Sequence, residues 1–572
     1  MMTVCACMWL GLFPLLQFGT YSTITYNKWA IMLLLTCFTL ICALNRKKPE
    51  EESLRDTKKK SNKKRIQEPI KIRSVPMILL ALLAGWIVLA NLVSIYEPVK
   101  WFFGATSRME GLLTQLCYLG LFFVFSRSEI RRIPVILSAV VGLFVFFHVV
   151  VLQRLGVNVF GLYPRGRSFE TTPEFQGTIG NIDMDVGYLC LMAGIFMTEI
   201  VIFLSSFWRD ILCRFCFRRY FGEKYATGSY PRSPLSGLVS VISPRRKARS
   251  GRFPTAESFF SSLHSGLSPL RLLLLCLYCF LFILYFLILI FALALTVFLI
   301  VTMDVQFGLI ALAALALITL LRFIPRSWLK PVLLILLVVA LNVVWYWPGQ
   351  IGGIWELKEI LYNRTQLSFG SNRLGVWLYS LTLARERLLV GSGSDTFYYR
   401  FNTFLRQNGL KLPDHQGNLP LPTNFDNPHN EYIAHLINHG LPAMLLFIAL
   451  ILAAVFWRRK TAAEKAAAPK SPADHIRMAS PWITAALCCF ITVNFSPSGW
   501  LIALMVWFVL IVYVSTADLP TRSVHYFRVL SPWAVAALCY AVQAFFSFSV
   551  CLVAPMFWVV LGICTEENNS TK

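Results

Sequence analysis

The sequence contains unusually few charged residues, and this shortage decides the class of protein. Only 14% of its 572 residues are Asp, Glu, Lys or Arg, whereas about a quarter is usual in soluble globular proteins. An ordinary cytosolic enzyme is therefore excluded. Aromatic residues make up a further 14% of the chain, which also excludes a disordered or fibrous protein.

Several other features are missing. No charged residue precedes Lys28, and no small-residue cleavage site leads into a polar domain, so we expect the N-terminus to be a membrane span rather than a removable signal peptide. None of the 15 cysteines falls in the long polar stretch 348–432, so no disulfide framework is predicted there. No repeat with a period of 20–50 residues is visible.

Apolar residues are abundant, at 56% of the chain. Runs of about 18 apolar residues or more are typical of membrane-spanning helices, and they recur from end to end. We therefore predict an all-α, polytopic membrane helical bundle. We expect the long stretch 271–304 to form one tilted helix rather than a tight pair. About fourteen spans are predicted, near 4–19, 29–45, 75–95, 111–126, 133–152, 182–206, 272–303, 306–321, 331–347, 433–457, 481–495, 499–516, 531–546 and 548–564.

The formal net charge of +24 lies in the basic segments between predicted spans. The positive-inside rule places such segments, and with them both termini, in the cytoplasm. Nothing resembles the basic, aromatic-lined groove of a nucleic-acid-binding domain, so no nucleic-acid partner is expected. Membrane lipids are the expected partners of the two long basic loops, 46–73 and 207–270, because Lys and Arg near the surface attract anionic head groups.

These spans and loops divide the chain into four regions. Residues 1–152 form the N-terminal spans with the basic loop 46–73. Residues 153–347 form the central spans, with an outer-face loop at 153–181 and the basic loop 207–270. Residues 348–432 form a large outer-face loop, and 433–572 form the C-terminal spans. Because long loops in compact proteins are usually functional, the site is expected in 348–432.

Three motifs in this loop could carry chemistry. The stretch Phe369-Gly-Ser-Asn-Arg-Leu-Gly-Val-Trp377 places Arg373 and Trp377 four residues apart, on one helix face. The stretch Gly391-Ser-Gly-Ser-Asp-Thr-Phe397 is a glycine-rich turn that carries Asp395. The loop closes with Asn427-Pro-His-Asn-Glu-Tyr432, so His429 and Asn430 are predicted at a helix start on the outer face of the membrane, where free N–H groups are available.

Each motif also has a purely structural interpretation. Arg373 could extend its charge to the membrane surface, with Trp377 as an interfacial aromatic residue. His429 could simply cap the helix start. His435 and His439 lie further along the same helix, and we interpret them as packing residues.

Taken in order, these motifs resemble the O-antigen ligase and polysaccharide polymerase family of bacterial membrane glycosyltransferases. The stretch from His429 to Pro442 is similar to the family pattern H-N-x-Y-L-x-x-L-x-x-x-G-L. A second stretch, Gly177-Thr-Ile-Gly-Asn-Ile-Asp-Met-Asp-Val-Gly-Tyr188, resembles the family's G-N-x-N segment at the outer start of a span. The resemblance covers roughly residues 160–460.

The resemblance implies a GT-C-like architecture and transfer of a glycan from undecaprenyl diphosphate to a hydroxyl or sugar acceptor, which could be a glycan, a lipid or a wall polymer. The active site would face outward from the cell membrane. The implied reaction is inverting and needs neither a metal nor another cofactor. Arg373 would hold the diphosphate, because a guanidinium binds phosphate oxygens in pairs, and His429 would orient or deprotonate the acceptor. The candidate substrate-binding residues are Arg364, Arg165, Arg167, Asn181, Asp395 and Asn430.

Two positions depart from the family pattern. Gln306 stands where many members have an arginine near the outer end of a helix, and Arg165 and Arg167 are candidates to replace its charge. Asp183 stands at the second asparagine of G-N-x-N. Together with Asp185 it could bind Mg²⁺, although side chains two apart at a helix start point in different directions.

Two other classes of protein remain open. A flippase or exporter of lipid-linked oligosaccharide could also have about fourteen spans, although transporters usually place charge within the spans. An inactive membrane partner in an envelope-assembly complex is the second, since Gln306 could abolish activity. Substitution of Arg373 or His429 by alanine would separate an enzyme from such a partner.

Overall fold

The computed structural model describes residues 1–45, 75–208, 269–321, 339–412, 425–456 and 531–570, apart from the single positions 341, 351, 363 and 549. Most of both basic loops and the first half of the predicted span 331–347 lie outside these residues, as do the whole predicted spans 481–495 and 499–516. The regular elements of the described part are helices, with one exception: the two-residue strands β1 (Phe175–Gln176) and β2 (Gly180–Asn181) pair antiparallel directly before a helix.

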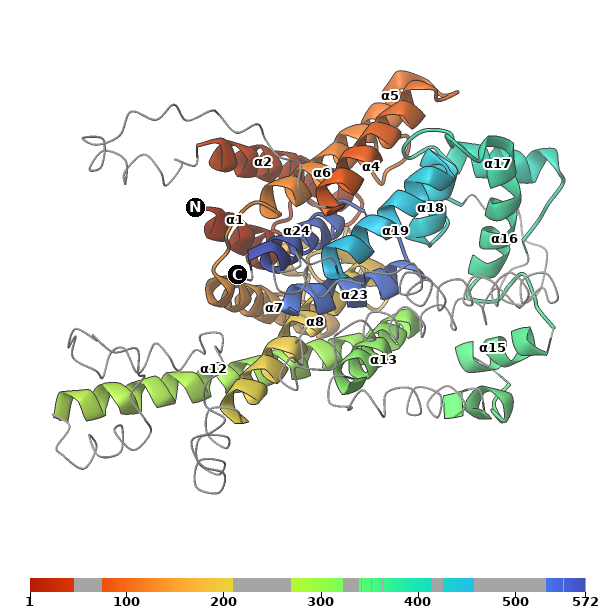
Figure 1. The fold of residues 1–572 in the computed structure, drawn as a ribbon. Helices are drawn as coiled ribbons and strands as arrows, with labels where there is room; N and C mark the ends of the chain where they lie inside the picture. The colour runs from red at the N-terminus through yellow and green to blue at the C-terminus, as the bar shows by residue number, and fades with distance from the viewer. Residues whose placement is uncertain are drawn as a thin grey trace, which may run out of the picture.

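The N-terminal and central regions form a bundle of long helices (Figure 1). Their apolar composition explains both their helical state and their mutual packing. The elements are α1 (Met2–Cys7), the π-helix η1 (Met8–Leu12), α2 (Ile24–Leu44), α4 (Val75–Leu92), the short α5 (Pro98–Phe103), α6 (Leu112–Phe125), α7 (Arg132–Arg154), the 3-10 turn η2 (Val159–Gly161), α8 (Ile182–Trp208), α12 (Pro269–Thr302) and α13 (Gln306–Leu321).

The remaining elements include the outer-loop helices and the last helices of the bundle. The loop helices α15, α16 and α17 lie at one side of the bundle, opposite to the N-terminus (Figure 1). The elements are α15 (Gly353–Leu361), α16 (Arg373–Ala384), the 3-10 turn η5 (Arg385–Arg387), α17 (Phe397–Gln407), α18 (Glu431–His439), α19 (Leu441–Phe456), α23 (Pro532–Ala544) and α24 (Ala554–Ser570).

The described helices confirm a helical membrane protein. Five of them, α2, α4, α7, α8 and α12, contain stretches long and apolar enough to cross a bilayer, and further apolar helices are shorter. As expected, α12 is one continuous helix, and its 34 residues give a length of about 50 Å, more than the roughly 30 Å of the hydrocarbon layer. Large apolar side chains are exposed along α2, α7 and α12, as expected of surfaces covered by lipid.

Three predicted span boundaries are wrong. The first helical segment ends at Leu12 rather than near residue 19. The predicted span 433–457 is divided at Gly440 into α18 and α19. The last helix begins at Ala554 rather than at 548. In each case apolar character continues past the end of the helix, so hydrophobicity alone did not reveal the break.

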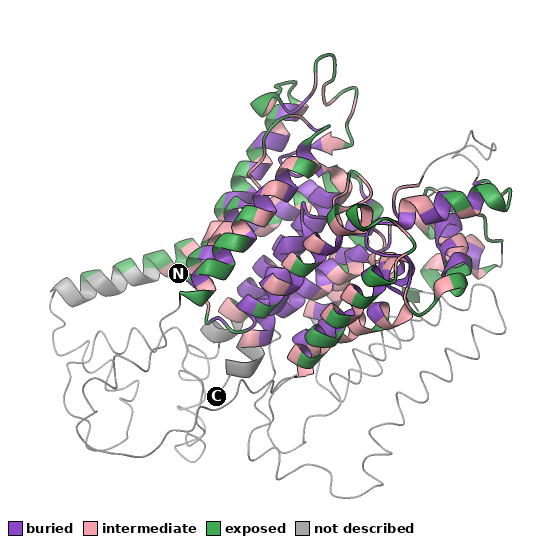
Figure 2. Cartoon of the chain, turned by 90° about the horizontal axis from the view of Figure 1, so that it is seen from above, coloured by how far each residue is buried: buried purple, intermediate pink, exposed green. Residues whose placement is uncertain are grey.

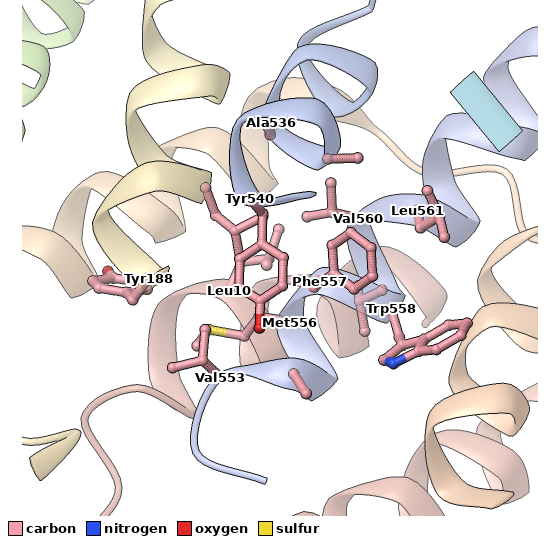
Figure 3. Packing of buried hydrophobic residues seen from close by; sticks show 14 of the residues in the cluster. Leu10, Tyr188, Ala536, Tyr540, Val553, Met556, Phe557, Trp558, Val560 and Leu561 are labelled. Carbon is pink, nitrogen blue, oxygen red and sulfur yellow. The ribbon is translucent and has the colours of Figure 1, made fainter. Parts of the chain in front are cut away.

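The core of the bundle lies between α8, α23 and α24. Buried residues are concentrated at its centre (Figure 2). The rings of Tyr540 and Phe557 stack with centroids 4.6 Å apart, and Trp558 packs beside them (Figure 3). At Gly194 a Cβ would overlap the backbone of Ala536, so this glycine allows α8 and α23 to approach closely, as small residues do between membrane helices. This contact fixes α8, whose first turn contributes to the candidate site.

Candidate functional site

Four helices begin beside one cluster of charged side chains. Asp183 lies in the first turn of α8, Arg373 is the first residue of α16, and His429 immediately precedes the start of α18. The fourth is α13, because the Arg373 guanidinium lies over the ring of Phe307 at 5.3 Å. Helix N-termini carry unpaired N–H groups and a partial positive charge, so their convergence favours an anion.

Asp183 joins the two residues predicted to be catalytic. Its Oδ2 lies 3.5 Å from an Arg373 nitrogen (Nη2) and 3.9 Å from His429 Nδ1. The side chains of Asp183, Arg373 and His429 are 15%, 23% and 31% exposed, so all three are partly shielded from solvent yet reachable. The structure thus brings Arg373 and His429 together through Asp183, the carboxylate for which the sequence suggests only a metal-binding role.

A second cation, Arg108, lies on the other side of His429. Its Nε and Nη2 atoms are 2.8 Å and 2.7 Å from Asp426 Oδ2. Its guanidinium lies over the ring of Phe548 at 4.7 Å, and the His429 imidazole meets the same ring edge to face at 4.9 Å. Phe548 therefore contacts both the Arg108 guanidinium and the His429 imidazole.

The hydrogen bonds that hold the turn before α18 leave out the side chain of His429. Asn427 Oδ1 accepts the backbone N–H of His429, the carbonyl of Pro428 accepts the indole N–H of Trp377, and Asn430 Oδ1 accepts the N–H of Ile433. Asn430, and not His429, is therefore the helix cap. His429 Nδ1 is buried and has no hydrogen-bond partner among the described residues. The turn presents this one imidazole without using it for structure.

The contacts of Trp377 and Arg373 also contradict the interfacial interpretation of this pair. Trp377 is buried and packs edge to face against Phe545, so it is not an aromatic residue at the lipid surface. Arg373 pairs with a carboxylate instead of reaching toward the membrane surface.

Backbone strain accompanies the site. Ser371 and Asn372, directly before Arg373, have φ values of 57° and 69°, and His429 itself has a φ of 48°. Met109, next to Arg108, has a φ of 58°. A residue other than glycine adopts a positive φ at a cost of order 1–3 kcal/mol, so packing around the cluster must offset that cost.

The electrostatics keep the imidazole neutral. Burial, together with the positive charges of Arg373 and Arg108, lowers the pKa of His429 to about 4, and the carboxylate of Asp426 opposes this shift. At neutral pH His429 is therefore unprotonated and able to accept a proton. Burial also lowers the pKa of Arg373, against the attraction of Asp183 and Glu356, but a guanidinium remains charged at any physiological pH.

Three predicted substrate-binding arginines lie elsewhere. Arg364 is 71% exposed and its nearest carboxylate is Glu359, at 4.0 Å. Arg165 and Arg167 are exposed in the loop before β1. Among the described residues, no hydrogen bond or ion pair joins any of the three to Arg373 or His429. The structure thus places Arg108, rather than these residues, beside the predicted catalytic pair.

Two further candidates have structural contacts. Asn181 Oδ1 accepts the backbone N–H of Asp183, so it fixes the start of α8. Asp395 accepts hydrogen bonds from the backbone N–H and the hydroxyl of Thr106, and burial raises the pKa of Asp395 to about 6 despite them. The glycine-rich turn before Asp395 lies against the end of α18, where the N–H groups of Ser392 and Gly393 donate to the carbonyl of Asn438.

The two aspartates of α8 point to different surroundings, as expected. Asp183 faces Arg373 and His429. Asp185 is fully buried, and the opposite charge that acts on it most strongly is that of Lys28. Within the described ranges, no group of three or more His, Cys, Asp or Glu side chains is arranged to hold a metal ion. Gln306 begins α13 beside Gly353, one residue before the Phe307 ring beneath Arg373.

Sequence reasoning missed Arg108 and Phe548. Arg108 lies in a short outer loop without a recognisable motif, and Phe548 lies in an apolar stretch that was interpreted as part of a span. The sequence indicates Arg108 only as a basic residue on the face predicted to lie opposite to the basic loops. It does not indicate which side chain Arg108 contacts.

The site can now be compared with known proteins. The described chain is a helical protein with several candidate membrane spans. Residues 289–448 match the family model described as O-antigen ligase, and this confirms the resemblance seen in the motifs. The match includes Arg373 and His429, whereas Asp183 and Arg108 lie outside it. A search of curated proteins gives no match to the chain. The family implies a multi-pass membrane enzyme that joins glycans.

Proposed function

We propose that this protein transfers a glycan from an undecaprenyl-diphosphate donor to a hydroxyl or sugar acceptor on the outer face of the cell membrane. The observation that supports this proposal is a cluster in which Arg373, Asp183 and His429 meet at the start of three helices. The acceptor class includes glycans, lipids and wall polymers. We propose a bundle of about fourteen spans, as the sequence predicts, in a GT-C-like arrangement.

The leaving group requires positive charge. As the bond between the anomeric carbon and the diphosphate oxygen breaks, that oxygen takes the bonding electrons and gains negative charge. Arg373, the nearby Arg108 and the converging helix N-termini all favour that charge. Since these groups supply positive charge without a metal ion, we propose a reaction that needs no metal.

The acceptor requires a base. In the proposed step, the acceptor oxygen bonds to the anomeric carbon from the face opposite to the diphosphate, which inverts the configuration. The hydroxyl proton passes to His429, whose imidazole is neutral at physiological pH. A positioned base of this kind contributes typically 10²–10⁴-fold to the rate.

The test is a transfer assay with purified protein in lipid vesicles. It supplies a fluorescent undecaprenyl-diphosphate glycan and an envelope fraction as acceptor, with and without chelator. We expect His429→Ala and Arg373→Ala to lose transfer by about 100-fold or more, while Arg385→Ala and His148→Ala, which lie outside the cluster, transfer as wild type does.

Three outcomes would contradict the proposal. Loss of transfer with chelator would show that a metal takes part. Unchanged transfer by both cluster variants would remove the assigned roles. If no form transferred glycan but the donor crossed the bilayer, the protein would be a transporter.

A further inference from the structure

Asp183 Oδ2 has two competing partners. Arg373 lies 3.5 Å from this oxygen and His429 Nδ1 lies 3.9 Å from it. A distance of 3.9 Å is too long for a hydrogen bond, so the carboxylate is engaged mainly by Arg373. His429 Nδ1 is left buried and without a hydrogen-bond partner among the described residues.

The other charged groups that face His429 are already engaged. On its own turn, Asp426 binds Arg108 through two nitrogens. On the loop before α6, Arg108 carries the wrong charge to accept a proton from Nδ1, as does Arg373 on α16. The remaining close neighbour is the ring of Phe548. Asp183 on α8 is thus the carboxylate left for Nδ1.

The backbone of Asp183 is fixed on both sides. Its N–H donates to Asn181 Oδ1, and its carbonyl accepts from the amide of Gln543 on α23. These contacts hold the Cα atom, so the carboxylate can change partner by rotating the side chain alone. About 0.7–1.2 Å separates the distance of 3.9 Å from an ordinary N–H···O hydrogen-bond distance.

We infer that Asp183 is a positioning residue that couples donor binding to activation of His429. A diphosphate on Arg373 takes the guanidinium from Asp183, and the freed carboxylate then accepts the N–H of His429 Nδ1. This fixes the tautomer in which Nε2 is the lone-pair nitrogen. Nε2 then takes the acceptor proton as the new glycosidic bond forms and the diphosphate departs.

This inference rests on the proposed function and adds an order of events. The same carboxylate that pairs with Arg373 serves the base once a diphosphate occupies the guanidinium. A carboxylate beside an imidazole favours its protonated form and raises its basicity. His429 would therefore become an effective base only when a donor diphosphate occupies Arg373.

The experiment compares Asp183→Asn and Asp183→Glu with wild type over pH 4–9 in the transfer assay, with donor saturating and then limiting. The control is Asp304→Asn, because Asp304 is an exposed aspartate at the outer end before α13 and its substitution removes the same charge. Folding of each variant is checked by thermal unfolding and size-exclusion chromatography.

For Asp183→Asn we expect a maximal kcat at least about 10-fold lower, since loss of the carboxylate that orients a catalytic histidine is costly. The acid limb of its kcat profile moves to lower pH, because a less basic imidazole loses its proton at lower pH. The donor KM does not rise, because Arg373 loses a competing anion. Asp183→Glu restores part of kcat, and Asp304→Asn leaves the profile unchanged.

The outcomes separate this inference from the proposed function. Suppose that wild type and Asp304→Asn transfer glycan, and that Asp183→Asn has the same kcat and the same acid limb as these two proteins. The inference is then overturned, while the proposed function stands. If wild type does not transfer, the function fails first. If Asp183→Asn does not fold, the pH profiles of wild type alone test the inference. We expect the acid limb of the wild-type kcat profile at higher pH than the acid limb of the kcat/KM profile. Acid limbs at the same pH would overturn the coupling.

Discussion

At the scale of single residues, the site is distinguished by His429, which the fold holds in an energetically unfavourable conformation and environment. His429 combines a positive φ, a buried Nδ1 without a partner in the described structure, and a pKa lowered to about 4. Asn430, next to it, has an ordinary structural contact as the cap of α18. A capping histidine would require none of the three costs, so their coincidence favours a chemical role for His429.

Asp395 provides a test of pH dependence at this scale. Burial raises its pKa from 3.8 to about 6, so the folded state holds the proton more tightly than the unfolded state does. The stability that this group contributes is complete below about pH 4 and is lost as the pH rises to about 6. We expect wild type to lose stability relative to Asp395→Asn over that window.

The measurement is the difference between the melting temperatures of wild type and Asp395→Asn at pH 4.5 and pH 7. Asparagine tolerates the positive φ of 56° at this position and keeps an oxygen for Thr106. A difference that stays constant between the two pH values would show that burial does not raise the pKa of Asp395.

At the scale of elements, the break between α18 and α19 connects the end of α18 to neighbouring segments. Gly440 has a φ of 85° and a ψ of 172°, a region open essentially to glycine alone. The following N–H, of Leu441, donates to the carbonyl of Leu388, and the indole of Trp86 donates to the carbonyl of His439. The break therefore joins the end of α18 to both the outer loop and α4.

We predict that Gly440→Ala destabilises the protein by about 1–3 kcal/mol or more. Its Cβ would overlap the carbonyl of Leu389, in addition to the backbone cost. Thermal unfolding in detergent provides the measurement, with Gly85→Ala as the matched control. Gly85 lies within α4 with open space around its Cα, so alanine there should be neutral or slightly stabilising. Equal melting temperatures for the two variants would contradict the importance of the break.

At the scale of the whole molecule, the asymmetry of charge sets the expected orientation. The loops 46–73 and 207–270 hold most of the basic residues and are expected in the cytoplasm. The loop 153–181 and the site cluster are expected on the opposite face. In the described structure, the loop helices lie at the side of the bundle away from the N-terminus (Figure 1), which agrees with this arrangement.

Cysteine labelling tests the orientation. We expect a membrane-impermeant maleimide to label Glu170→Cys in right-side-out vesicles, because Glu170 is exposed in the loop 153–181. Lys58→Cys should react only in inverted vesicles. Wild type corrects for reaction at the 15 native cysteines. Reversed labelling would place the site on the cytoplasmic face and contradict the proposed function.

The sequence by itself determined the class, the helices and two residues of the cluster. Apolar runs give the spans because a bilayer requires backbone hydrogen bonds to be satisfied within each helix, and α4, α7, α8 and α12 lie close to their predicted positions. Arg373 and His429 could be selected because each stands in a local motif whose residues were readable in order. Helix ends were less predictable, since apolar character continues past Leu12 and across Gly440.

Only the tertiary structure decided which charges meet. Arg373 and Asp183 are 190 residues apart, and Arg108 and Asp426 are 318 apart, so no local pattern could pair them. The contact between α8 and α23 fixes Asp183, and Phe548, from an apolar stretch, contacts both Arg108 and His429. Arg165, Arg167 and Arg364 have the same charge as Arg108 but lie elsewhere. Charge is a property of the residue, whereas its distance from another charge depends on the packing of the whole bundle.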